Sequence, residues 1–330
     1  DYYVYKKVNL LVITKNSIVS PSAKDRILSV KYKFDNIFNV KAINFTSSYT
    51  DVIKYQSILL TIPSYLKDYF VSTLKIIFSL NKADIIFIQY TITPLLIPFA
   101  EIYIKLFYRN KLIIYDIDDL IHKKIDTYKI KIINYLKLHT YGSTLLFSIS
   151  NCNTFGNKEL FKIAKGKNNF LNLTPKFNSI KRKKITNKVF IGYIGFKATF
   201  DNLNFISKAL TNLLNKYSFL EIIIIGSEKK YLNHKRCHYW KYNLNTEKRF
   251  YNKIHIGINP LENNLVNLYK SGGKLIGYYN HNCLGISSNI GICKFITKKN
   301  NGILINNLSN KSWEKGISKI LDNKRSLDNY

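Results

Sequence analysis

Two lysines enclose a pair of glycines in the segment Lys270-Ser271-Gly272-Gly273-Lys274, at the start of a predicted helix over residues 274–279. Glycine lets another molecule approach the backbone closely because it has no Cβ atom. Free N–H groups at a helix start, together with the positive end of the helix dipole, attract anions. The segment is therefore a candidate seat for a diphosphate. The alternative is an ordinary glycine-containing loop with solvated lysines.

A cluster of carboxylates, Asp116, Asp118 and Asp119, follows an apolar stretch that predicts a strand over residues 111–115. In open α/β sheets the carboxyl ends of the strands face the ligand crevice. Carboxylates there can act as a base, orient sugar hydroxyl groups or hold a metal, and His122 could face the same crevice. The alternative for Asp118 or Asp119 is helix capping. Because no companion ligand spacing is present, we predict no metal site.

A second glycine-containing turn runs from Gly192 to Lys197, after a predicted strand over residues 189–194. It does not match the GxGxxG fingerprint of dinucleotide-binding proteins. Gly195 would still let a phosphate approach the backbone, with Lys197 as its cation, and the alternative is a plain tight turn. His234 and His238 have a spacing that suits zinc, but no second ligand pair lies nearby, which favours a surface loop.

The cysteines show no CxxC spacing and predict reduced thiols of a cytosolic protein rather than a disulfide framework. They are Cys152, Cys237, Cys283 and Cys293. Walker A, GxSxG and HExxH motifs are absent, and we predict no cofactor. Methionine is absent and the chain begins at Asp1, which suggests that an N-terminal piece is missing or was removed.

The formal net charge is +31, from 51 Lys and Arg against 20 Asp and Glu. Such a charge suits nucleic acid, an anionic membrane surface or phosphorylated substrates. However, the chain is rich in Lys, Asn, Ile, Tyr and Phe, which AT-rich codons encode, and the charge is spread along the sequence. Charge alone therefore argues weakly for nucleic acid, and peripheral attraction to anionic lipid is the better interpretation.

Two apolar segments bear on the membrane question. Residues 85–107 contain Pro94, Pro98, Glu101 and Lys105, which predicts a strand, a turn and a helix instead of a membrane span. Residues 53–80 predict a long amphipathic helix, broken at Pro63, with lysines among apolar neighbours. We expect the second segment to give the N-terminal domain a basic, apolar surface that could rest on anionic lipid.

Predicted strands and helices alternate along the whole chain, which indicates parallel sheets with right-handed crossovers. The predicted strands of the first half are 8–14, 39–45, 84–90, 111–115 and 144–149, and those of the second half are 189–194, 220–225, 253–259 and 283–287. A basic stretch without periodicity, residues 176–188, separates the halves. The pattern predicts an α/β protein with two Rossmann-like domains, residues 1–178 and 179–330, facing a cleft.

Several segments together resemble a group of bacterial GT-B glycosyltransferases, the glycosyl transferases group 1 type, or family four. In the first half the resemblance rests on ADIIFIQY and KLIIYDIDDLI. In the second half it rests on FIGYIGFKAT, EIIIIGS, IHIGINPLENN, and KSGGKLIGYY followed by CLGISSNIG. The order of the segments covers nearly the whole chain.

The resemblance implies a nucleotide-sugar donor in the C-terminal domain, a glycan or lipid-linked acceptor near the N-terminal domain, and no obligatory metal. It favours a retaining transfer in polysaccharide or cell-envelope biosynthesis, in the cytoplasm or at the inner face of the plasma membrane. Asp118 or Asp119 would orient or deprotonate the acceptor hydroxyl. The donor diphosphate would be held by backbone and basic groups of Gly195, Lys197, Lys270, Ser271, Gly272, Gly273 and Lys274.

Some positions depart from the family pattern. The family commonly has a glutamate that holds the donor ribose where this chain has Gly277, and the final helix looks cut short. Three hypotheses therefore stand: an active sugar transferase, a degenerate GT-B protein that binds a nucleotide sugar or a partner without turnover, and a nucleic-acid-binding protein supported by charge alone.

Overall fold

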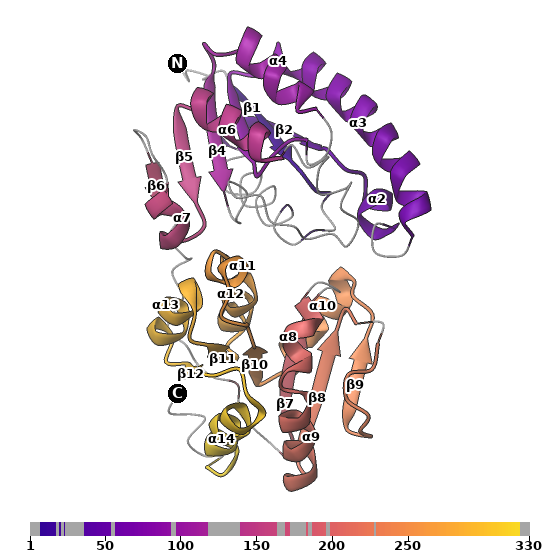
Figure 1. Ribbon diagram of the computed structural model, residues 1–330, viewed down its shortest axis with the longest axis vertical. Helices are drawn as coiled ribbons and strands as arrows, with labels where there is room; N and C mark the ends of the chain where they lie inside the picture. Colours follow the sequence, from indigo (N-terminus) through magenta and orange to yellow (C-terminus); the bar gives the residue numbers. More distant parts are fainter. Residues whose placement is uncertain are drawn as a thin grey trace, which may run out of the picture. The chain divides into compact units, whose positions relative to one another are not determined.

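The computed structural model describes residues 7–17, 20, 23, 36–53, 57–93, 97–117, 139–163, 169–171, 183, 187–195, 199–227 and 229–323. The chain divides into two compact units, Asp1–Asn172 and Leu173–Tyr330. Each unit is a parallel sheet with helices against it (Figure 1). The predicted α/β class with two parallel sheets is confirmed, whereas the predicted boundary between residues 178 and 179 lies outside the described residues.

The sheet of the N-terminal unit has the strand order β2-β1-β3-β4-β5-β6, and all neighbours are parallel. β1 is the first strand in the sequence but lies between β2 and β3 in the sheet. The strand order therefore reverses between β1 and β3, and the carboxyl ends of these two strands form the switch point at which open parallel sheets bind ligands. Its strands are β1 (Val8–Thr14), β2 (Phe38–Asn44), β3 (Ile85–Gln89), β4 (Leu112–Ile117), β5 (Cys152–Phe155) and β6 (Asn169–Leu171). Its helices are α2 (Ser48–Ile53), α3 (Ile58–Leu80), α4 (Phe99–Phe107), α6 (His139–Ile149) and α7 (Lys158–Ile163).

The sheet of the C-terminal unit has the order β12-β11-β10-β7-β8-β9, again all parallel. This is the doubly wound order of dinucleotide-binding domains, with its switch point between β7 and β10. The strands are β7 (Val189–Ile194), β8 (Leu220–Ile225), β9 (Cys237–Trp240), β10 (Ile256–Asn259), β11 (Leu284–Ser288) and β12 (Ile303–Ile305). The helices are α8 (Phe200–Asn204), α9 (Ser207–Lys216), α10 (Leu244–Lys253), α11 (Leu265–Leu268), α12 (Gly273–Asn280), α13 (Gly291–Lys299) and α14 (Asn310–Leu321).

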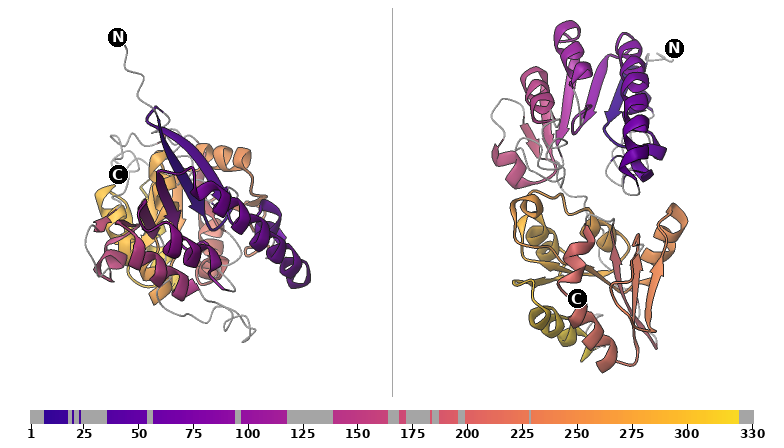
Figure 2. Two further views of the ribbon diagram at one scale, coloured as in Figure 1. Left: turned by 90° about the horizontal axis from the view of Figure 1, so that it is seen from above. Right: turned by 45° about the vertical axis from the view of Figure 1, so that its right-hand side comes forward.

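Both faces of this second sheet are covered by helices (Figure 2, right). On one face α9 and α14 bury their apolar sides, with Trp313 fully enclosed against the strands. On the other face α10, α12 and α13 form a second core that contains Phe250, Tyr278 and Ile296. Because the strands are buried on both faces, β8 reads as an almost uninterrupted apolar run, LEIIII, in which all six residues are buried.

A row of glycines crosses three strands of this sheet under α12. Gly257 of β10 is in register with Gly192 of β7 on one side and with Gly285 of β11 on the other. A Cβ atom at Gly257 would overlap the buried ring of Tyr278, and one at Gly285 would overlap the hydroxyl of Tyr279. Gly257 and Gly285 therefore make room for two tyrosines of α12 and limit how closely that helix approaches the sheet, whereas Gly192 makes room for Phe250 and Ile254.

Several sequence predictions are corrected here. Residues 144–149 are not a strand but the end of α6, whose Leu145, Leu146 and Ile149 are buried at helical spacing. The strand that follows this helix is β5. The short apolar run at residues 144–149 was predicted as a strand because length and composition distinguish short buried strands from buried helix segments poorly. Pro63 does not break the long helix either. It lies inside α3, which starts after the N-cap residue Ser57.

Further elements were missed or misplaced. The strands β9 and β12 and the helix α13 were not predicted, and β10 starts at Ile256 because Lys253 ends α10. His238 lies on the edge strand β9 and its Nε2 bonds Glu221 Oε2 at 2.9 Å, so the predicted surface loop is wrong at this residue. Among the described residues no helix combines the length and apolarity that crossing a bilayer requires.

We expect Gly257→Ala to lower the free energy of unfolding by about 1–3 kcal/mol, because the added methyl group would enter the space of the Tyr278 ring. The matched control is Gly273→Ala in α12, where an added Cβ would meet no heavy atom within 4 Å. Chemical denaturation of the two variants checks this. Equal stability of Gly257→Ala and the parent protein would contradict the role given to the glycine row.

Candidate nucleotide-diphosphate site

The candidate site lies in the C-terminal unit, at the carboxyl ends of β7 and β10. Gly195 follows β7 directly, and its N–H donates to the Ile225 carbonyl at 3.1 Å. After β10 the chain passes through Pro260 and Leu261 into the short helix α11 and then α12. Open parallel sheets bind their ligands at such a switch point.

The start of α12 is open on the outside and closed on the inside. Gly272 is its N-cap, with a left-handed φ of 74° that side chains rarely adopt, and a Cβ there would lie 2.6 Å from Ile296 Cδ1. No side chain caps this helix end. Gly273, the next residue, is exposed, and nothing lies within 4 Å of the position of a Cβ atom. An anion can therefore approach the first N–H groups of α12 without displacing protein atoms.

Lys274 turns its ammonium group inward, toward β7. Its Nζ donates to Tyr193 Oη at 3.0 Å and lies 4.2 Å from the centroid of the same ring. A Cβ on Gly195 would lie 3.4 Å from this Nζ. Tyr193 Oη donates in turn to the Thr199 carbonyl at 2.6 Å, so the hydroxyl is oriented to accept from the lysine. The ammonium is thus held at the end of β7, where the candidate site requires a cation.

Burial perturbs the charge of this lysine strongly. Loss of water around the ammonium lowers the pKa of Lys274 to about 7, and the nearby Cys293 acts weakly in the opposite direction. Within the described part of the chain no carboxylate pairs with Lys274. A buried ammonium without an acidic partner is the electrostatic arrangement that an anionic ligand would complete.

Lys270 adds a second positive charge in the same place. Burial raises the pKa of the Cys293 thiol to about 11, while Lys270 and Lys274 both act to lower it. Burial likewise raises the pKa of Tyr193 to about 12, again against an opposing effect of Lys270. Both lysines of the predicted segment therefore act on the same groups, and the predicted seat for a diphosphate has two cations near one helix start.

The loop between β10 and α12 is fixed by amides that sequence reasoning missed. Asn264 caps α11 by accepting from the Asn267 N–H at 2.9 Å, and Asn267 Nδ2 donates to the Glu262 carbonyl at 2.9 Å. The Glu262 N–H donates to Asn202 Oδ1 at 3.0 Å, which ties the loop to α8. Asn264, which follows a strand in the sequence, could have been recognised as a helix cap. The bond between Asn202 and the Glu262 N–H could not, because it joins residues that are far apart in the sequence.

Gly277 stands where the resembling family has a glutamate, and the structure shows what replaces that side chain. A Cβ on Gly277 would overlap the Tyr251 hydroxyl and lie 2.8 Å from its Cζ. Tyr251, from α10, stacks on His281 with ring centroids 4.4 Å apart, and His281 Nδ1 bonds the Gly277 carbonyl at 2.8 Å. A tyrosine and a histidine therefore occupy the space beside this turn of α12.

The remaining predicted site residues are not part of the described group around Lys274. Asp118, Asp119, His122 and Lys197 lie outside the described residues. Asp116 is buried, and its Oδ1 accepts from Thr154 Oγ1 at 2.5 Å, so it serves the interior of the N-terminal unit. No group of three or more His, Cys, Asp or Glu residues that could hold a metal occurs in the described ranges.

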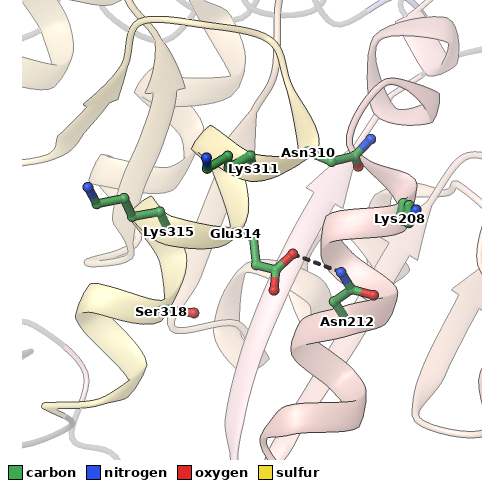
Figure 3. A pocket seen from close by; sticks show the side chains of 7 residues that line it. All are labelled: Lys208, Asn212, Asn310, Lys311, Glu314, Lys315 and Ser318. Carbon is green, nitrogen blue, oxygen red and sulfur yellow. Dashed lines mark hydrogen bonds between the residues drawn. The ribbon is translucent and has the colours of Figure 1, made fainter.

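Two pockets lie elsewhere. One, of about 480 Å³, lies between α9 and α14, where Asn212 Nδ2 donates to Glu314 Oε2 at 2.8 Å (Figure 3). It contains no residue of β7, β10 or α12 and is distinct from the candidate site. The other, of about 390 Å³, lies in the N-terminal unit beside the ends of β1 and β2. Its lining includes Ser17, whose buried Oγ has no hydrogen-bond partner among the described residues.

The fold matches known structures over nearly its whole length. A glycosyltransferase from Rickettsia africae superposes with a TM-score of 0.60 at 12% identity, covering 98% of this chain and 91% of that chain. A UDP-GlcNAc 2-epimerase from Neisseria meningitidis bound to UDP-GlcNAc superposes with a TM-score of 0.55 at 9% identity, covering 97% and 93%. A trehalose-6-phosphate synthase superposes with a TM-score of 0.56 at 12% identity, covering 96% and 92%.

No protein-family model and no curated protein sequence matches the chain. The likeness to the solved structures therefore shows the fold, and the GT-B architecture expected from the sequence is confirmed. Assignment to family four stays a prediction.

We expect Lys274→Ala to weaken binding of UDP or GDP about ten- to a hundredfold, because a charge-assisted hydrogen bond contributes roughly 1.5–3 kcal/mol. Binding of uridine or guanosine should change little, since neither has a phosphate. The matched control is Lys294→Ala, an exposed lysine of α13. Isothermal titration measures the affinities. An unchanged diphosphate affinity in Lys274→Ala would place the phosphate seat elsewhere.

Proposed function

We propose that the protein is a glycosyltransferase that moves a sugar from a nucleotide-sugar donor to a glycan or lipid-linked acceptor. The observation that carries the proposal is the ammonium of Lys274, which has no carboxylate partner among the described residues and donates to Tyr193 beside the open helix start at Gly273. The fold supports it, because superposable structures include glycosyltransferases and an epimerase with UDP-GlcNAc bound. The resemblance in sequence favours transfer with retention, in polysaccharide or cell-envelope biosynthesis.

The chemistry follows from where negative charge develops. When the bond between the sugar and the diphosphate breaks, the diphosphate gains charge as the leaving group. The ammonium groups of Lys270 and Lys274 and the N–H groups at the start of α12 stabilise that charge more in the transition state than in the bound donor. Because these groups are fixed before the donor arrives, little reorganisation is needed during the reaction. On the acceptor side we propose Asp118 or Asp119 as the group that orients or deprotonates the hydroxyl.

A non-catalytic donor-binding protein is the second candidate, and the environment of Gly277 favours it. The tyrosine hydroxyl beside Gly277 takes space that a longer side chain at this position would need. A protein altered in this way could keep its diphosphate seat but lose the hold on the donor ribose. Such a protein would still bind the donor diphosphate but would no longer hold the donor ribose in place.

Turnover separates the candidates. The protein is incubated with UDP- and GDP-hexoses, and nucleoside diphosphate release and the sugar product are followed by chromatography and NMR. Release with sugar transferred to an acceptor or to water supports the transferase. Binding without any product supports the non-catalytic candidate. Conversion of the donor sugar to its epimer would assign epimerase chemistry and overturn the proposal, as would absence of binding to all donors.

We expect Gly277→Glu alone to give no gain in UDP affinity, because its side chain would collide with Tyr251. Combined with Tyr251→Ala, the glutamate should bind the ribose hydroxyls and raise UDP affinity about ten- to a hundredfold over Tyr251→Ala alone. The control ligand is 2′,3′-dideoxy-UDP, for which the gain should vanish. An equal gain for both ligands would show that residue 277 does not face the ribose.

A further inference from the structure

The longest helix of the N-terminal unit, α3, carries a long apolar stripe on its exposed side. Its outward side is apolar and includes Leu59, which is 79% exposed, Phe70 at 64% and Phe78 at 71%. We call this side the α3 face. It consists of Leu59, Leu60, Ile62, Pro63, Leu66, Lys67, Phe70, Val71, Leu74, Lys75 and Phe78, all of them exposed. The spacing of three and four residues places them on one stripe along the helix.

The inward side of α3 is mixed: Tyr65, Ile76 and Leu80 are buried there, together with several polar side chains. Asp68 Oδ2 accepts from the Ser47 N–H at 2.7 Å, and Ser72 Oγ donates to the Phe45 carbonyl at 2.8 Å. Thr73 Oγ1 is buried and has no hydrogen-bond partner among the described residues. A helix that packs polar groups inward and presents a continuous apolar stripe outward is poorly matched to water. A contiguous exposed apolar surface of this kind marks an interaction site.

The charges on this side of the unit have one sign. The acids of the two neighbouring helices point inward: Asp68 of α3 and Glu101 of α4 are both buried. Glu101 Oε1 accepts from the Ile92 and Thr93 N–H groups at 3.0 and 2.9 Å. By contrast, Lys67 and Lys75 are exposed on the α3 face. The neighbouring helix α4 continues the apolar surface with exposed Phe99, Leu106 and Phe107.

We propose that the α3 face docks on the surface of an anionic lipid bilayer. The apolar stripe would enter the boundary between headgroups and acyl chains, with the helix lying in the plane of the membrane. Lys67 and Lys75 have stems long enough to lie along the stripe while their ammonium groups reach lipid phosphates. A second copy of the chain fits less well, because the α3 face carries cations and no acid to pair with them.

A pocket beside the α3 face agrees with a lipid as the occupant. Val71 and Lys75 of the face also line the pocket of about 390 Å³ in the N-terminal unit. Its other lining residues are mostly polar, among them Ser17 and Asn44, and they include Asp68, whose Oδ2 accepts from the Ser47 N–H. An apolar stripe that borders a polar pocket with a lysine at its rim matches the order of acyl chain, phosphate and headgroup in a lipid. This proposal concerns the N-terminal unit and does not depend on the donor site.

Co-sedimentation with vesicles tests the proposal on the full chain. Vesicles of phosphatidylcholine alone are compared with vesicles of equal parts phosphatidylcholine and phosphatidylglycerol. We expect the protein to bind the anionic vesicles. The double variant Lys67→Gln with Lys75→Gln should bind them roughly 20- to 30-fold more weakly, because each lysine near an anionic surface contributes about a fivefold factor to the affinity. The matched control is Lys311→Gln with Lys315→Gln, which removes the same charge from α14.

The apolar contribution has its own pair of variants. Phe70→Ser with Phe78→Ser should weaken binding to anionic vesicles by more than about tenfold for each phenylalanine, since burying such a side chain is worth at least that factor. Phe205→Ser, at an exposed phenylalanine of the C-terminal unit, should leave binding unchanged. Thermal unfolding followed by circular dichroism confirms that the variants fold, which we expect because the substituted side chains are exposed.

A reporter variant keeps the proposal testable if those variants do not fold. Phe70→Trp should be quenched by brominated lipid in anionic vesicles, whereas Phe205→Trp should not. Equal binding to neutral and anionic vesicles, no binding to either, or quenching of both reporters alike would overturn the proposal. The protein could also self-associate in the absence of lipid. If the double variant Phe70→Ser with Phe78→Ser abolished that self-association, the lipid proposal would be overturned and the α3 face would be assigned to a second copy of the chain.

Discussion

The contact between the glycine row of the second sheet and the tyrosines of α12 is the constraint on which the candidate site depends. Gly192, Gly257 and Gly285 lie side by side on three strands; Gly192 lies against Phe250 and Ile254, and Gly257 and Gly285 leave room for α12. Tyr278 and Tyr279 fill that space, and the Tyr278 hydroxyl donates to the Ile258 carbonyl at 3.1 Å. With these rings in place the position of α12 is set, and Lys274, one turn before Tyr278, donates to Tyr193 of β7.

The position of Lys274 then explains its chemistry. An ammonium removed from water loses solvation free energy, which here is compensated by one hydroxyl and the face of one ring. That compensation is incomplete, as the lowered pKa shows. A diphosphate would supply the missing negative charge, whereas a nucleoside, which has no phosphate, would not. The same interaction would strengthen as charge accumulates on the leaving group.

Much of the fold and the centre of the site could be predicted from local sequence. Buried parallel strands such as β1 and β8 are continuous apolar runs, and the glycines and lysines at residues 270–274 carry their chemistry in their residue types. The glycine row could not be predicted, because Gly192, Gly257 and Gly285 are far apart in sequence and become neighbours only through strand register. The obstruction of Gly277 by Tyr251 and the partnership of Tyr193 with Lys274 likewise depend on tertiary packing.

The long helix α3 shows a different limit. Its periodicity was sufficient to predict an amphipathic helix, but periodicity alone does not say which side faces the core. The usual expectation would bury Phe70 and Phe78, whereas Asp68 and Ser72 are inside because they bond the backbone of the chain before the helix. These two polar interactions with the segment that leads into α2, together with the burial of Tyr65, Ile76 and Leu80, set which side of α3 reaches the surface.

Titration of the Lys274 ammonium by NMR tests the central claim most directly. The lysines are labelled with ¹³C-methyl groups, and the Lys274 signal is assigned by its loss in Lys274→Arg. The account predicts a pKa of about 7 for Lys274 in the free protein. Bound UDP should raise this pKa toward the ordinary lysine value of about 10.4, because a neighbouring anion stabilises the protonated form. A pKa near the ordinary value without ligand, or one that saturating UDP leaves unchanged, would contradict it.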